Sequence, residues 1–231
     1  SLIHDRLIQA ADRGVDVKIL IDDSFLAGAD QQILALHEHQ NIQYRVYNPY
    51  KRRSTNAVSR QVLNLSEFAR LDHRMHNKTM VVDNQVAIIG GRNLADEYFG
   101  IDKEYNFRDM ELLAGGPIVP KIAMSFDTYW NDQWSFPIDA VGHLGARKTT
   151  RTTVSQRAEG ISSSFPVLGN DARDELWRQT VQTSFRGTAR LYVDKPPSVS
   201  PDAPEDRPIQ VADELVQLVN SARKEVVIVS A

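Results

Sequence analysis

Cysteine is absent from the 231 residues, which excludes disulfide bonds and thiolate metal sites. Apolar runs are short, and none reaches the roughly 18 residues that a membrane-spanning helix needs. An excess of basic charge is missing as well: 27 Lys and Arg stand against 30 Asp and Glu, which gives a formal net charge of -3. Because nucleic-acid-binding domains favour a basic face, we expect no nucleic-acid partner. Apolar residues make up 42% and charged residues 25%, the composition of a globular domain with a real core.

Segments of helical and strand-like periodicity alternate along the first 137 residues. Apolar residues recur at helical spacing over residues 2–11, and residues 15–21 alternate as a buried strand does and end at Asp22-Asp23. The same patterns predict further helices at residues 33–37, 62–71 and 117–130, and further strands at residues 42–47, 74–82, 86–89 and 110–113. We therefore expect an α/β fold with a mixed, largely parallel sheet flanked by helices.

Three parts are expected along the chain, and the first ends near Pro137. Residues 138–208 are rich in Ser, Thr, Gly, Arg and Pro, which predicts an irregular linker region with one short strand at residues 190–193. A helix and then a strand at residues 209–229 repeat the order of residues 2–21, so residues 209–231 are expected to begin a second, similar half. The sequence starts without Met and stops in an apolar run, and we expect it to be a piece of a longer protein.

The segment that carries chemistry runs from Arg74 to Asp83. In a strand, side chains two residues apart share a face, so Arg74, His76 and Lys78 are expected to point the same way. A His beside a Lys on one strand face is unusual, because each is costly to bury without a partner. An anionic phosphate would pair with both side chains.

Each of these side chains has a chemical use at a phosphate. A neutral imidazole at His76 can attack phosphorus, and a protonated one can give its proton to a leaving oxygen. Lys78 supplies a fixed cation, and Asn93 can donate its amide to the same non-bridging oxygens. Gly90 and Gly91 let the backbone pass close to the ligand. The sequence shows no cluster of metal ligands, so we expect neither a metal nor a cofactor, with cations in the place that Mg²⁺ takes in nucleotide-dependent phosphoryl transfer.

Structural explanations compete with these roles. A lone His is more often a hydrogen-bonded structural residue than a catalytic one, and Lys78 alone would be a surface charge. By alternation Asp83 faces away from His76, and Asp-Asn is a natural turn, so both a catalytic and a structural role stay open. The other histidines have no supporting context: His4, His37, His39, His73 and His143.

The spacing H-x-K-x4-D-x6-G-G-x-N, from His76 to Asn93, resembles the signature of the phospholipase D superfamily. Further segments resemble the bacterial cardiolipin synthase branch of that superfamily, namely Gly90–Phe99, Phe107-Arg108-Asp109, Gly116-Pro117 and Phe126–Trp130. The resemblance covers about residues 1–137 and resumes near residue 209. It implies one phospholipase D-like catalytic half at residues 1–137 and the start of a second at residues 209–231.

The resemblance also implies a mechanism in which two halves each give one His to a shared site. One His forms a phosphohistidine, while the other protonates the leaving alcohol and then deprotonates the acceptor. Asp109 matches the family carboxylate that holds the imidazole of the other half's His or of its own, although it could also be a charge at a strand edge. No second His-x-Lys occurs in the 231 residues, so the other half is expected further along the same chain or from a second copy. Gly91 stands where many relatives have Ser.

The expected function is that of a phosphatidyl transferase of the cardiolipin synthase type, which exchanges the alcohol on a phospholipid such as phosphatidylglycerol. We expect a membrane surface as a partner and a place at the cytoplasmic membrane, peripheral or facing the cytoplasm. A basic stretch before the motif suits an anionic lipid surface, or is a solvated loop: Arg45, Lys51, Arg52, Arg53, Arg60, Arg70 and Arg74. The alternatives are a phospholipase D hydrolase, a nuclease of the same superfamily and an inactive lipid-binding half.

Overall fold

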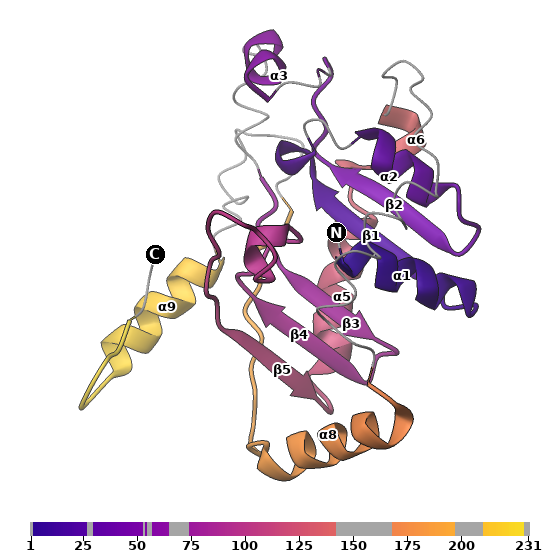
Figure 1. Ribbon diagram of the computed structural model, residues 1–231. Helices are drawn as coiled ribbons and strands as arrows, with labels where there is room; N and C mark the ends of the chain where they lie inside the picture. Colours follow the sequence, from indigo (N-terminus) through magenta and orange to yellow (C-terminus); the bar gives the residue numbers. More distant parts are fainter. Residues whose placement is uncertain are drawn as a thin grey trace.

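The computed structural model describes residues 2–26, 30–52, 54, 57–64, 74–141, 168–196 and 210–228. Two three-stranded sheets and the helices around them make up these residues (Figure 1). The α/β class expected from the sequence is confirmed. Helix α3 (Ala57–Leu63) begins before the helix predicted at residues 62–71 and shares only its first two residues. Residues 65–71 of that prediction lie outside the described residues.

The first sheet contains β1 (Val17–Asp22), β2 (Ile42–Tyr47) and β6 (Ser135–Pro137) in the order β1-β2-β6. β1 and β2 are parallel, and β6 runs antiparallel to β2. Helix α1 (Leu2–Asp12) lies across this sheet in Figure 1, because its apolar stripe packs on the inward-facing residues of β1.

The core of this unit joins α1, both parallel strands and two further helices, α2 (Asp30–His37) and α6 (Ile138–Val141). Its buried members are Ile8, Ala11, Val17, Ile19, Leu26, Ile33, Leu36, Ile42, Tyr44, Val46 and Ile138. A short 3-10 helix, η1 (Asp23–Phe25), follows β1 directly and turns the chain at the carboxyl end of the strand. This end of β1 carries the polar network described below.

The second sheet contains β3 (Thr79–Val82), β4 (Val86–Gly90) and β5 (Glu111–Gly115), all antiparallel. Asp83 and Asn84 connect β3 to β4 and have φ angles of 51° and 53°. Gln85 completes this three-residue connection, and its amide donates to the carbonyl of Val82 at 3.0 Å, which closes a turn whose two central residues have positive φ. The turn predicted at residues 83–85 is therefore confirmed.

Helix α5 (Val119–Trp130) connects the two sheets. Its first turns bury Val119 and Ile122 against Ala87 of β4, and in Figure 1 the helix runs behind the second sheet. Its last turn meets the first sheet, where the ring of Tyr129 packs edge-on against Tyr47 at 5.5 Å between centroids. This amphipathic helix therefore packs against both sheets.

The expected direction of the sheets is partly wrong. Of the four strand pairs in the described residues, β1–β2 is parallel and the other three are antiparallel, so the sheets are not largely parallel. The tight turn at residues 83–85 explains part of this, since so short a connection can join only antiparallel strands. The strand predicted at residues 74–82 is also shorter than expected, because residues 74–78 precede β3 instead of pairing within it.

The region after Pro137 differs more from the expectation of an irregular linker. A 14-residue helix, α8 (Asn170–Thr183), lies within residues 138–208, whereas residues 190–193 form no strand. Helix α8 buries no residue, and hydrogen bonds between side chains one turn apart stabilise it, such as that from Gln179 to Glu175. Helix α9 (Gln210–Ser221) agrees with the helix predicted after residue 209, but residues 226–228 lie in no strand. The division into two halves stays a prediction.

Candidate functional site

The ends of three strands bring the predicted site residues to one end of the second sheet. The antiparallel register sets Gly90, at the end of β4, opposite Glu111, at the start of β5. The amide of Gly90 also donates a hydrogen bond to the carbonyl of Lys78, 3.3 Å away, just before β3. Lys78, the Gly90-Gly91 pair and Asp109 therefore approach the same edge.

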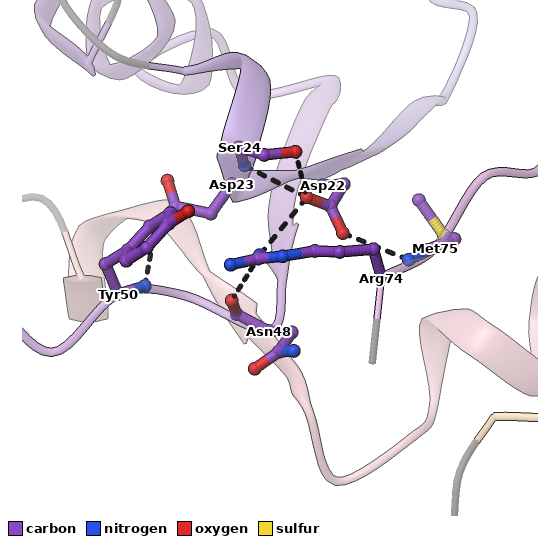
Figure 2. A network of polar contacts seen from close by, with 7 residues as sticks. All are labelled: Asp22, Asp23, Ser24, Asn48, Tyr50, Arg74 and Met75. Carbon is purple, nitrogen blue, oxygen red and sulfur yellow. Dashed lines mark hydrogen bonds and ion pairs between the residues drawn. The ribbon is translucent and has the colours of Figure 1, made fainter. Parts of the chain in front are cut away.

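The buried carboxylate of Asp22 lies where this edge meets the first sheet. Asp22 ends β1 and is 3% exposed. Its Oδ2 accepts a hydrogen bond from the amide of Met75 at 3.0 Å (Figure 2). Its Oδ1 accepts from the amide and hydroxyl of Ser24 at 2.9 and 2.6 Å and pairs with the Arg74 guanidinium at 3.2 Å. The residues that lead into His76 are therefore fastened to the end of β1.

Arg74, expected to bind substrate, has partners within the protein at Nη1, whereas its buried Nη2 has no hydrogen-bond partner among the described residues. Besides Asp22, its Nη1 donates to the carbonyl of Asn48 at 3.2 Å, and its guanidinium stacks over the ring of Tyr50 at 4.7 Å. The neighbouring carboxylate of Asp23 accepts the amide of Tyr50 at 2.6 Å, which fixes that ring under the guanidinium (Figure 2). Arg74 thus joins β1, the loop after β2 and the segment before His76.

His76 and Lys78 differ in their surroundings. His76 is exposed, and its ring makes no hydrogen bond or ion pair with any other described residue. The ammonium of Lys78 donates to the carbonyl of His76 at 2.8 Å. Burial lowers the pKa of Lys78 below its usual value, while the carboxylates of Asp109 and Asp22 act in the opposite direction. Among the described residues the imidazole has no partner, and the half-buried ammonium of Lys78 bonds to the backbone of the same residue.

The absence of a side chain at Gly91 makes room for Asp109. A Cβ atom built on Gly91 would lie 2.7 and 2.9 Å from the carboxylate oxygens of Asp109, closer than such atoms approach. At Gly90 a Cβ would collide with the side chain of Glu111. Gly91, noted as a departure from Ser, therefore has a local reason: the carboxylate of Asp109 fills the space that a Ser side chain would need.

Asn93 follows β4 and is held by a short aromatic loop. Its amide nitrogen donates to the hydroxyl of Tyr98 at 3.0 Å, and Tyr98, at the end of the 3-10 helix η3 (Asp96–Tyr98), contacts the ring of Phe107. The neighbouring Arg92 pairs with Glu111 at 2.7 Å and donates to the carbonyl of Tyr98. These contacts hold the segment that carries Asn93 against the loop of Tyr98 and the start of β5.

Asp83 lies away from the other candidates. It is exposed in the turn between β3 and β4, five residues beyond Lys78. At the rise of a strand, this separation is about 17 Å. Its positive φ and its place in the turn favour the structural role that the sequence left open.

Asn77 and Tyr129 attach the segment around His76 to helix α5. The sequence did not predict this contact, and it did not predict the role of Asp22. The buried hydroxyl of Tyr129 donates to the carbonyl of Asp194 at 3.0 Å and receives a hydrogen bond from the side chain of Asn77. Burial raises the pKa of Tyr129, and the hydrogen bond from Asn77 lowers it. For Asp22 a signal existed, because polar residues after a buried parallel strand mark the carboxyl edge where sites gather. No pattern in the sequence relates Asn77 to Tyr129.

Several other candidates have structural contacts or lie outside the described residues. His39 pairs with Asp12 at 3.1 Å, and His37 accepts the amide of Tyr44. Arg45 stacks on Trp130 at 4.7 Å. The positions outside the described residues are Arg53, Arg70, His73 and His143, together with the side chain of Arg60. Within the described ranges, no group of three or more His, Asp or Glu residues could hold a metal ion.

Comparison with known proteins gives a family and several distant relatives. The family model described as "Cardiolipin synthase, PLD-like domain" matches residues 1–130. An uncharacterized protein of Helicobacter pylori strain J99 is 33% identical over 240 residues, which cover this whole chain and 46% of the relative. Cardiolipin synthase C of Escherichia coli K12 is 38% identical over 140 residues, 61% of this chain and 29% of the relative. A cardiolipin synthase of Staphylococcus aureus Mu50 is 31% identical over 57% of the chain.

The chain spans less than half the length of these curated relatives. No solved structure matches it. Among the residues that the structure describes, no helix has both the length and the apolar character needed to cross a bilayer.

Proposed function

Because the chain belongs to the cardiolipin synthase, PLD-like domain family, we propose that it carries half of the active site of a phosphatidyl transferase. The reaction is exchange of the alcohol on a phospholipid phosphodiester through a phosphohistidine at His76. The observation that carries this proposal is the open imidazole of His76 beside the half-buried ammonium of Lys78, on a segment that Asp22 fastens to β1. Such a pair is suited to a phosphate and has no evident use in the core.

The first step forms a bond from an imidazole nitrogen of His76 to phosphorus and breaks the bond from phosphorus to the leaving alcohol oxygen. The leaving oxygen takes a proton from a general acid. One His cannot be nucleophile and general acid in the same step, so this acid is a second His, from another half or a second copy. In the second step that His removes the proton of the acceptor alcohol, whose oxygen attacks phosphorus and releases His76.

The charge that develops on the non-bridging oxygens is met by residues of this chain. Lys78 supplies a positive charge whose partial burial strengthens its field at the phosphate. Asn93 can offer the N–H of its amide that does not bond to Tyr98. Asp109 would hold the imidazole of His76 and stabilise its charged form, as the family pattern implies.

A phosphatidylglycerol-like lipid is the proposed substrate, taken from a membrane surface on the cytoplasmic side. The names of the Escherichia coli and Staphylococcus aureus relatives support a lipid substrate. The basic stretch supports it less than its sequence suggests, because Arg45 and Arg74 are occupied by Trp130 and Asp22. Lys51 and Arg52 are exposed, and Arg52 donates to the carbonyl of Leu63 at 3.4 Å.

The experiment is a lipid exchange assay with labelled phosphatidylglycerol and glycerol as the added acceptor. Wild-type protein in a form that supplies both histidines, with a further half or as a dimer, should pass the phosphatidyl group to glycerol, both with and without EDTA, and His76→Ala should lose this activity. His39→Ala is the matched control, since His39 pairs with Asp12 on the first unit and should leave the exchange intact.

Three results would contradict the proposal. Retained exchange in His76→Ala would remove the assigned nucleophile. Loss of activity in EDTA would show that a metal neutralises the phosphate. Release of free phosphatidic acid at a rate that glycerol does not change would assign hydrolysis in place of transfer.

A further inference from the structure

The carboxylate of Asp22 accepts more hydrogen bonds than the cap of a short helix requires. Asp22 is the residue before η1, and capping that helix uses only its Oδ1, which accepts the amide of Ser24 at 2.9 Å. The second oxygen, Oδ2, accepts the amide of Met75, 53 residues further along the chain. A buried carboxylate with donors on both oxygens holds two distant segments in a fixed relation.

Both residues before His76 are fastened to this carboxylate. Met75 is bound through its amide, and Arg74 through an ion pair at 3.2 Å that the stacked ring of Tyr50 supports. Figure 2 shows the guanidinium running beneath Asp22, with the Met75 amide turned toward the same carboxylate. Because the amide is one residue from His76, a shift of this bond moves the imidazole.

The segment is also held on the far side of His76. The side chain of Asn77 bonds to the hydroxyl of Tyr129, and the carbonyl of Lys78 accepts the amide of Gly90. The His76 ring itself has no bond to another described residue, so its position depends on its neighbours. Of these supports, Asp22 is the one that also carries charge.

We propose that Asp22 is a positioning residue for the reaction, which sets the place of His76 through the Met75 amide. The inference rests on the proposed function and adds a role outside the His-x-Lys motif. Asp22 makes no hydrogen bond to the imidazole, and it acts through Met75 and Arg74.

The test is Asp22→Asn, which keeps the size of the side chain and one acceptor oxygen. Ser24 and Arg74 offer three hydrogen bonds to Oδ1, so the amide oxygen should stay there and the NH₂ group should face the Met75 amide. Two donors then meet, and the Met75 bond is lost. We expect kcat for transfer from phosphatidylglycerol to glycerol to fall by about 10- to 100-fold, because small misplacements of reacting groups cost this much. KM should change by less than about threefold.

The control is Asp5→Asn. Asp5 is also buried, at 8% exposed, and accepts a side-chain hydrogen bond from Gln9 within α1. Asp5→Asn should lower the melting temperature by less than Asp22→Asn does, because Asp5 accepts one of these side-chain hydrogen bonds and Asp22 accepts several, and it should leave kcat unchanged. A fall of kcat in Asp5→Asn as large as that in Asp22→Asn would overturn the proposal, and so would an unchanged kcat in Asp22→Asn.

Amide hydrogen exchange keeps the test independent of turnover. If wild-type protein fails to act on phosphatidylglycerol, the proposed function is wrong, but exchange at Met75 still reports whether Asp22 holds the segment. The Met75 amide should exchange at least about tenfold faster in Asp22→Asn than in wild type, and at the wild-type rate in Asp5→Asn. An unchanged rate at Met75 in Asp22→Asn would overturn the inference.

Discussion

At the scale of single residues, the sequence predicted which side chains suit a phosphate better than it predicted how the fold holds them in place. The spacing of His76, Lys78 and Asn93 indicated a phosphate site, and the structure places Lys78 beside Gly90 at one edge of a sheet. The sequence assigned residues 74–78 to a strand, whereas the structure fixes them through Asp22. A hydrogen bond between residues 53 apart leaves no local pattern, so only coordinates could show it.

Lys78→Ala tests the cation at this scale. We expect kcat to fall by about 100-fold or more, because a charge placed for the transition state is lost from a partly buried site. Stability should change little, since Lys78 has one hydrogen bond, to the carbonyl of His76. The measurement is kcat and melting temperature, with the exposed Lys103→Ala as the control. Comparable losses in the two variants would show that general surface charge, and not Lys78, matters.

At the scale of elements, hairpins and amphipathic helices were predictable, and polar helices were not. The Asp83–Asn84 turn and α5 follow from turn residues and apolar spacing, and both are present. Helix α8 has no buried residue and is supported by pairs such as Arg173 with Asn170, which a search for apolar periodicity cannot find. Sheet direction was also beyond the pattern, because alternation is the same in parallel and antiparallel strands.

Substitutions of Asp83 in the hairpin turn should change the stability of the protein without changing kcat. Asp83 has a φ of 51°, which is costly for Ala and free of strain for Gly. Asp83→Ala should lower the free energy of unfolding by about 1 kcal/mol, and Asp83→Gly should cost less. Urea denaturation of both variants, with kcat measured on folded protein, tests this. A large loss of kcat in Asp83→Gly with unchanged stability would assign Asp83 to catalysis.

At the scale of the whole molecule, the site contains one His-x-Lys where the proposed reaction needs two histidines. The chain also covers 46% or less of the relatives described above. The second His is therefore proposed to come from a further half or from a second copy. The sequence predicts that a second His is needed, because it contains one His-x-Lys motif. It does not show whether a further half or a second copy supplies that His.

A monomer of this chain alone should transfer phosphatidyl groups poorly, since nucleophile and general acid cannot both be His76. Light scattering and the exchange assay on the same sample test this. Activity that rises with protein concentration as dimers form would indicate that a second copy supplies the acid. Robust turnover by a demonstrated monomer would contradict the two-histidine account.

Direct detection of the covalent intermediate tests the central claim most closely. Protein mixed with short-chain phosphatidylglycerol and no added acceptor should gain the mass of one phosphatidyl group. The adduct should be stable in alkali and labile in acid, as a phosphorus–nitrogen bond is, and peptide mapping should place it on His76. Addition of glycerol should remove it, and His76→Ala should not form it. An adduct of equal yield in His76→Ala, or one placed on another residue of wild type, would contradict the account.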